Sequence, residues 1–102
     1  MELMTDELKE NFPALTAQDN MGDAAIVHAK FFCPWNSWTW YATEYDPKEE
    51  SFFGLVKGLD TELGYFSLAD LESVTGPGGL KIERDLYFGT PTLGEVKSKM
   101  ED

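Results

Sequence analysis

The sequence predicts a small α+β domain in which an antiparallel sheet of about four strands packs with two or three short helices. Stretches of strand-forming residues follow one another at hairpin spacing in the first half of the chain, and two helix-capping signatures lie in the second half. The 102 residues, of which 42% are hydrophobic, can fill one modest core. We therefore expect a single domain over residues 1–102, with a radius of gyration of about 13 Å.

The first expected element is a short helix over residues 6–11. Thr5 can cap this helix, and acidic residues occupy the first turn, where the helix dipole favours negative charge. Pro13 ends the helix or begins a turn. The polar residues 16–23 are then expected to form a loop.

A three-stranded antiparallel meander is expected next. The first strand, residues 24–33, places Ala25, Val27, Ala29 and Phe31 on one face. The turns that follow contain proline beside polar or charged residues, which are typical of tight connections. The expected second strand, third strand and following loop span residues 38–45, 52–56 and 58–64.

The second half of the chain predicts a helix, a strand and a terminal helix. Ser67 with Asp70 three residues later is a variant of the capping box, and the glycine-rich residues 76–79 break the helix that it begins. Alternation over residues 80–88 predicts a strand that is exposed on one face. Thr92 and Glu95 form a second capping box, which opens the terminal helix.

The net charge of −11, from 19 acidic and 8 basic residues, limits the classes of partner. Nucleic acids and anionic membranes are repelled by such a chain, so we expect no direct binding to either. A basic protein surface is attracted by the same charge, for example the surface with which a protein holds nucleic acid. Residues 24–43 contain no acid, which indicates that they form the centre of the core.

The remaining composition favours a cytoplasmic protein. No apolar run approaches the ~20 residues that span a bilayer, and the acidic N-terminus is unlike a signal peptide. Cys33 is the only cysteine, which excludes an internal disulfide and a cysteine-based zinc site within one chain. His28 and Cys33 fall on opposite faces of the expected strand, so they cannot form a local nucleophilic pair.

Three blocks carry a resemblance to a known family: Glu62–Glu72, Gly76–Leu80 and Ile82–Phe88. In this order and separation they resemble the small bacterial domain-of-unknown-function family 2958, as does the chain as a whole. The resemblance implies no established activity, cofactor or catalytic residue. It implies a setting on plasmids, conjugative elements and phages, and hence a role in mobile-element biology.

The leading hypothesis is a non-enzymatic interaction protein of a mobile element, an anti-defence or DNA-mimic inhibitor that binds a basic protein surface. It assigns no catalytic residue, cofactor or metal. Mimicry of DNA requires the acids to segregate onto one side, because only about half of an even distribution faces one partner. The residues expected to contact the partner are acids of the middle segments and one turn tryptophan: Glu44, Asp46, Glu49, Glu50, Asp60, Glu62 and Trp35.

Two other classes of function stay open at this point. A small metal-dependent enzyme would use Glu83 and Asp85 with Glu44 or Asp46, provided that the strands over 38–45 and 80–88 are neighbours. A structural or homo-oligomerising module would instead use the aromatic residues around Trp35 as its contact.

Overall fold

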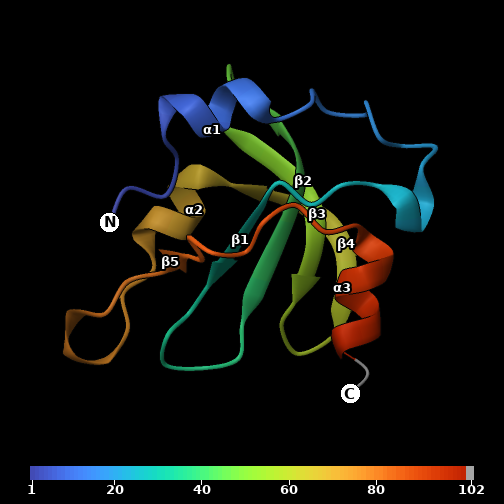
Figure 1. Ribbon diagram of the computed structural model, residues 1–102. Coiled ribbons are helices and arrows are strands. Elements are labelled where there is room, and N and C mark those ends of the chain that lie inside the picture. Colours follow the sequence, from blue (N-terminus) through green and yellow to red (C-terminus); the bar gives the residue numbers. More distant parts are fainter. Residues whose placement is uncertain (101–102) are drawn as a thin grey trace.

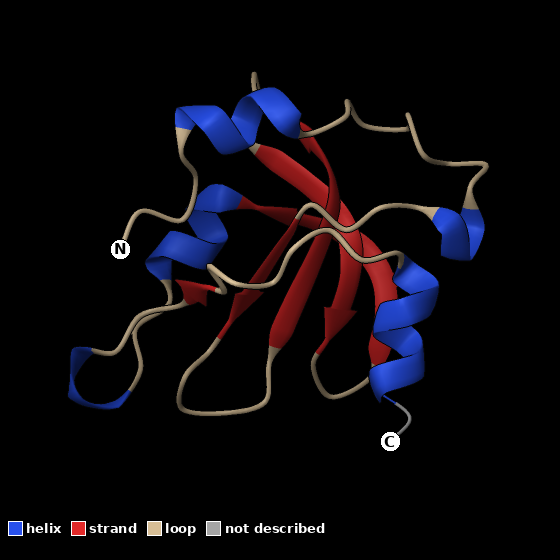
Figure 2. Ribbon diagram, viewed as in Figure 1, coloured by secondary structure: helices blue, strands red, loops and turns tan. Residues whose placement is uncertain are grey.

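Five antiparallel strands form one sheet in the spatial order β4-β3-β2-β1-β5, and three short α-helices pack on it (Figures 1 and 2). The computed structural model describes residues 1–100. The strands are β1 (Ala29–Phe32), β2 (Thr39–Asp46), β3 (Ser51–Lys57), β4 (Thr61–Ser67) and β5 (Glu83–Arg84). The helices are α1 (Asp6–Asn11), α2 (Leu68–Ser73) and α3 (Leu93–Met100), with 3-10 turns η1 (Gly22–Ala24) and η2 (Pro77–Gly79). The predicted α+β class is confirmed.

The helix starts follow the capping residues in the sequence. The hydroxyls of Thr5 and Ser67 each accept the backbone N–H three residues later, at 3.1 and 3.0 Å. At α3, the Thr92 hydroxyl accepts the Glu95 N–H while the Glu95 carboxylate accepts the Thr92 N–H, both at 3.2 Å. This reciprocal pair is a capping box, so all three predicted helix starts are confirmed.

The sheet carries an apolar cluster on each face. Helices α1 and α2 cover one face, called here the α1/α2 face, and α3 covers the other, called the α3 face (Figure 1). The cluster on the α1/α2 face contains Leu3, Met4, Ala29, Phe31, Cys33, Ala42, Tyr45, Phe52, Phe66, Leu68, Leu71 and Ile82. The cluster on the α3 face contains Ala25, Val27, Tyr41, Leu55, Leu93 and Val96. None of the described helices is long and apolar enough to cross a membrane.

A β-bulge in β2 changes which side chains of this strand point to each face of the sheet. The pairing with β3 shifts between Ala42 and Glu44, so the alternation of side chains inverts there. As a result Ala42 and Tyr45 both join the cluster on the α1/α2 face, although regular alternation would separate them. Glu44 is directed to the other face.

Three sequence predictions about strands were wrong. The strand expected over residues 24–33 is limited to β1, and the residues expected on one face are divided: Ala25 and Val27 lie on the α3 face, Ala29 and Phe31 on the α1/α2 face. Residues 61–67, expected to be mostly loop, form β4 because they pair with β3 along its whole length. The strand expected over residues 80–88 is reduced to β5, because its ladder with β1 is limited to the pairs that Phe31 and Phe32 make with Arg84 and Glu83. The chain around β5 turns away into the bridge between Thr75 and Lys81 on one side and a bend on the other.

Candidate functional site

Three segments that are distant in the sequence meet at one end of the sheet: α1, the β2–β3 turn and α2. The carbonyl of Pro13, just after α1, accepts the N–H of Tyr45 at 3.0 Å. The carbonyl of Glu50, in the turn, accepts the N–H of Leu68 at the start of α2, at 2.9 Å. The centroid of the Phe12 ring lies 5.8 Å from that of the Tyr45 ring, and this contact packs the end of α1 against β2. We call residues 6–11, 46–50 and 68–73 the acidic end.

The acidic end holds eight acids and two lysines, so it carries six of the eleven net negative charges. The acids are Asp6, Glu7, Glu10, Asp46, Glu49, Glu50, Asp70 and Glu72, all of them exposed except the half-buried Asp46. The ion pairs within residues 1–100 join Lys30 to Asp85 and Lys97 to Asp23, outside this end. Its negative charge is therefore not neutralised within the described chain.

Tyr45 lies beneath the acidic end, and the carboxylates there affect the pKa of its hydroxyl. Its side chain is 1% exposed, and its hydroxyl finds no hydrogen-bond partner within the described residues. Burial raises the pKa of Tyr45, and the nearby carboxylates of Glu50, Asp46 and Glu72 raise it further. Carboxylates from the β2–β3 turn and from α2 thus lie close enough to the Tyr45 hydroxyl to raise the same pKa.

The residues predicted to contact a partner do not share one surface. Asp46, Glu49 and Glu50 belong to the acidic end. Asp60 is exposed in the β3–β4 turn and Glu62 is exposed at the start of β4, and successive turns of an antiparallel meander lie at opposite ends of the strands. The predicted acids are therefore divided between two ends of the sheet.

Glu44 lies inside the protein and has a structural role. Its side chain is 2% exposed, and its two carboxylate oxygens accept the N–H groups of Thr16 at 2.8 Å and Gln18 at 2.9 Å. The Gln18 amide in turn donates to the carbonyls of Thr43 and Ile26 and accepts the Ile26 N–H. Glu44 therefore anchors the loop after α1 to the sheet and presents no charge at the surface.

Trp35 is half-buried beside the glycine-rich loop. It packs against the cluster on the α1/α2 face, and a Cβ built on Gly76 would lie 2.4 Å from its ring. Because Gly76 has no side chain, the loop can cover the indole closely. Trp35 was expected to form a contact surface, but much of its indole ring instead packs against this loop.

The carboxylates proposed for a metal site lie apart. β1 separates β2 from β5, so Asp46 and Glu83 are not on neighbouring strands, and Glu44 is held by the loop. Asp85 pairs with Lys30 at 3.8 Å. Among residues 1–100 no three histidine, cysteine, aspartate or glutamate side chains gather as metal ligands.

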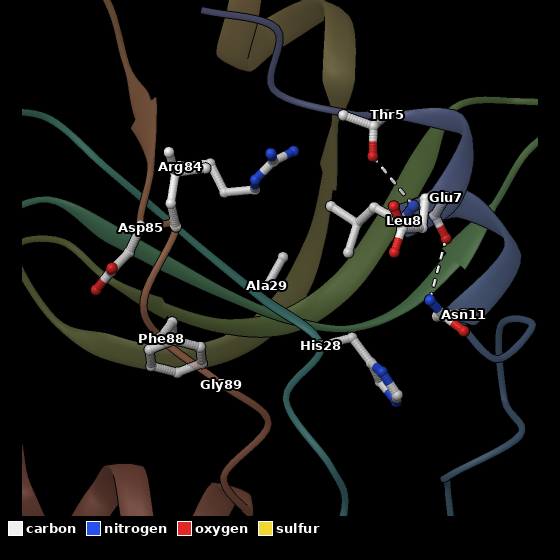
Figure 3. A pocket seen from close by; sticks show the side chains of 11 residues that line it. Thr5, Glu7, Leu8, Asn11, His28, Ala29, Arg84, Asp85, Phe88 and Gly89 are labelled. Atoms are coloured by element: carbon white, nitrogen blue, oxygen red, sulfur yellow. Dashed lines mark hydrogen bonds between the residues drawn. The ribbon is translucent and has the colours of Figure 1, made fainter.

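A cavity of about 250 Å³ between α1, β1 and the segment after β5 brings together the only arginine and the only histidine of the chain (Figure 3). Arg84 donates through Nη1 to the Leu3 carbonyl at 2.7 Å. Burial lowers the pKa of His28, whose ring lies 5.5 Å from the Phe12 ring, so the imidazole is neutral at pH 7. Figure 3 shows the two side chains directed away from each other, so they form no acid–base pair.

Three of the seven lysines lie together on the α3 face. Lys30, Lys57 and Lys99 line a cavity of about 560 Å³, together with Tyr41 and Phe88. The Lys30 ammonium lies 6.0 Å from the centroid of the Phe88 ring, within the range of a cation–π contact. Asp85 and Glu95 line the same cavity, so two acids offset most of this positive charge.

A family model described as "Protein of unknown function (DUF2958)" matches residues 2–95. The chain belongs to the DUF2958 family. The match spans nearly the whole chain, so it covers the sheet, α1, α2 and the first three residues of α3. No curated protein and no solved structure is similar to this DUF2958 chain in the comparisons made.

The sequence alone does not place α1 and α2 beside the β2–β3 turn. The acids of α1 and α2 can be identified in the sequence. Only the tertiary contacts of Phe12 and Leu68 bring them beside the β2–β3 turn. The hydrophobic staple positions Phe66 and Leu71 offered one usable signal. They fix the angle at which α2 leaves β4.

Proposed function

We propose that this DUF2958 protein is a non-enzymatic binding protein whose acidic end engages a basic surface on another protein. The partner fits the class of nucleic-acid-processing or host-defence proteins, whose binding surfaces are rich in lysine and arginine. The proposal includes a cytoplasmic setting on a mobile genetic element, for which the family resemblance is the support.

One observation carries the proposal: eight acids from three distant segments gather at one end without an ion pair in the described chain. Evenly spread acids would serve solubility alone. Here residues 6–11, 46–50 and 68–73 hold six of the eleven net negative charges, although they are only 17 of the 102 residues. The field at the acidic end is therefore stronger than an even distribution of the same net charge would give.

The acidic end can discriminate partners by charge at moderate ionic strength. The Debye length is about 8 Å at physiological salt and about 3 Å at 1 M, so exposed acids contribute to binding in the first condition and little in the second. Exposed ion pairs contribute about 0.2–1 kcal/mol each. Several such pairs give a binding energy that falls steeply with salt.

The test compares two variants with the same change in net charge. Glu49→Lys with Glu50→Lys alters the acidic end, whereas Asp19→Lys with Asp60→Lys alters two exposed acids outside it. The probe is a fluorescent peptide of lysines, and the affinity is measured by anisotropy from about 0.05 M to about 1 M salt. Circular dichroism confirms that both variants are folded.

We expect the acidic-end variant to bind the lysine peptide about 5- to 30-fold more weakly than the control variant, because two attractive contacts become repulsive. Binding of the unaltered protein should disappear at high salt. Equal losses in the two variants would contradict the proposal, because the peptide would then respond to net charge alone. Binding that is insensitive to salt would contradict it as well.

A further inference from the structure

The outer edge of β4 is the long unprotected edge of the sheet. Within residues 1–100, β4 pairs with β3 on one side and with no strand on the other. Its seven residues include no proline and no lysine, the residues that commonly protect such edges. The opposite edge is β5, which has only two residues and is covered by Met1, whose sulfur accepts the Arg84 N–H at 3.2 Å.

The hydrogen-bond pattern shows which backbone groups of β4 are free. The Gly58 N–H donates to the Asp60 carbonyl at one end of the β3–β4 ladder, and the Leu68 N–H donates to the Glu50 carbonyl at the other, both at 2.9 Å. Both bonds continue the β3–β4 register by one residue at either end, and bonded pairs alternate along an antiparallel ladder. Even-numbered residues of β4 therefore bond to β3, and the N–H and C=O groups of Leu63 and Tyr65 point outward.

The side chains of the same two residues form an apolar strip. Leu63 is 51% exposed and Tyr65 is 66% exposed, both on the α3 face of the sheet. The Tyr65 ring contacts the Phe53 ring edge-on, with 4.9 Å between their centroids. Leu63 also lines a cavity of about 420 Å³, which has Leu55 and Met100 among its other walls.

The strand is symmetric about Gly64, its middle residue. If a second β4 lies antiparallel with the two Gly64 residues opposite each other, Leu63 of each copy faces Tyr65 of the other. Their outward backbone groups then form bonded pairs, as the alternation requires. The same arrangement places each Tyr65 ring against the other copy's Leu63, the residue that lines the cavity.

The charges of the strand fit the same arrangement. Glu62 is the only charged residue of β4, and it would lie opposite Phe66 of the other copy instead of another acid. Like charges directly opposite each other destabilise strand pairs, and this register avoids them. The acidic end contributes most of the net charge and lies around the β2–β3 turn, so the edge itself is nearly neutral at its centre.

We propose that two copies of this chain associate through their β4 edges, antiparallel about Gly64, and join two five-stranded sheets into one. The interface is isologous: each copy contributes one Leu63–Tyr65 contact and the same backbone bonds. This association does not depend on the acidic end. It strengthens with salt, because screening weakens the repulsion between two chains of charge −11.

The test is sedimentation velocity on the full chain at increasing concentration, up to about 1 mM. We expect a species of twice the 11.5 kDa chain mass, more abundant at high salt. Leu63→Lys with Tyr65→Lys should weaken dimerisation at least about tenfold, because the strip then carries charge at the paired edge. Tyr65→Phe should retain it.

The matched control is Tyr87→Lys, an aromatic-to-lysine change at a residue that is 96% exposed and remote from β4. It should dimerise as the unaltered protein does. A chain that stays monomeric at the highest concentration and high salt overturns the proposal. So does a Leu63→Lys, Tyr65→Lys variant that is folded and dimerises with unchanged affinity.

Discussion

Replacing Glu44 by alanine removes the acceptor for two backbone N–H groups inside the protein. The carboxylate oxygens lie 2.8 and 2.9 Å from the nitrogens of Thr16 and Gln18, and the side chain is 2% exposed. A hydrogen bond to a charged group contributes about 1.5–3 kcal/mol, so the loss of both should cost about 3–6 kcal/mol. Because small domains are stable by about 5–15 kcal/mol, Glu44→Ala should be severely destabilised.

Two further variants separate the hydrogen bonds from the charge. Glu44→Gln keeps one carbonyl acceptor but turns an amide donor toward the other N–H, so we expect a loss of about 2 kcal/mol. Glu49→Ala, which changes an exposed acid with no side-chain bond in the described residues, should change stability by less than about 0.5 kcal/mol.

The assay is urea unfolding followed by tryptophan fluorescence, with hydrogen exchange measured at the amides of Thr16 and Gln18. At least one of the two amides should exchange faster in Glu44→Gln than in the unaltered protein, since one of the two acceptors is lost. A Glu44→Ala protein as stable as Glu49→Ala would refute the assignment of Glu44 as the anchor of the loop. Unchanged exchange at both amides in Glu44→Gln would refute it independently.

Four other substitutions test separate parts of the structure, each by urea unfolding. Tyr45→Phe should stabilise the protein by about 1 kcal/mol, because it removes a buried hydroxyl without a partner; a loss of stability would mean that the hydroxyl is bonded. Thr16→Gly should stabilise by about 0.5 kcal/mol, since Thr16 has a left-handed φ of 73°, and destabilisation would contradict this strain. Burial lowers the pKa of His28, so the folded state favours neutral imidazole: its stabilising effect is complete above pH 6.5 and is lost as the pH falls below that value. The unaltered protein should therefore lose stability relative to His28→Asn between about pH 7 and about pH 5, and parallel curves would exclude this linkage. Gly76→Ala should cost about 1–3 kcal/mol and expose Trp35, because the new Cβ meets the indole; equal stability and fluorescence would contradict the packing.

Local signals in the sequence determined the helix starts but not the extent of the strands. Thr5, Ser67 and Thr92 act on N–H groups within three residues, so the sequence alone was sufficient for their prediction. β4 contains Gly64 and follows a turn that begins at Gly58, and both glycines favour a loop locally. Its pairing with β3 overrides that preference, and pairing between strands is not a local property.

The candidate site was predictable only in part for the same reason. The Asp46–Glu50 turn was identified from its charges, but its neighbours in space come from α1 and α2. The burial of Glu44 follows from the bulge after Ala42, which inverts the side-chain alternation and has no marker in the local sequence. A carboxylate that looked like surface charge is therefore the anchor of a loop.

Salt separates the two proposed associations of this protein. Binding of a basic partner at the acidic end weakens as salt rises, whereas pairing of two β4 edges strengthens. The two can therefore be measured in one series of solutions. Failure of one leaves the other intact, because they use opposite charge effects and different residues.

The most direct test of the acidic end is an NMR titration of the isotopically labelled chain with a lysine peptide at low salt. We predict chemical-shift changes concentrated in residues 6–11, 46–50 and 68–73, which disappear when the salt is raised to about 1 M. Shifts distributed over all exposed acids, or centred on Asp60 and Glu62 at the opposite turn, would contradict the assignment of the acidic end as the binding surface.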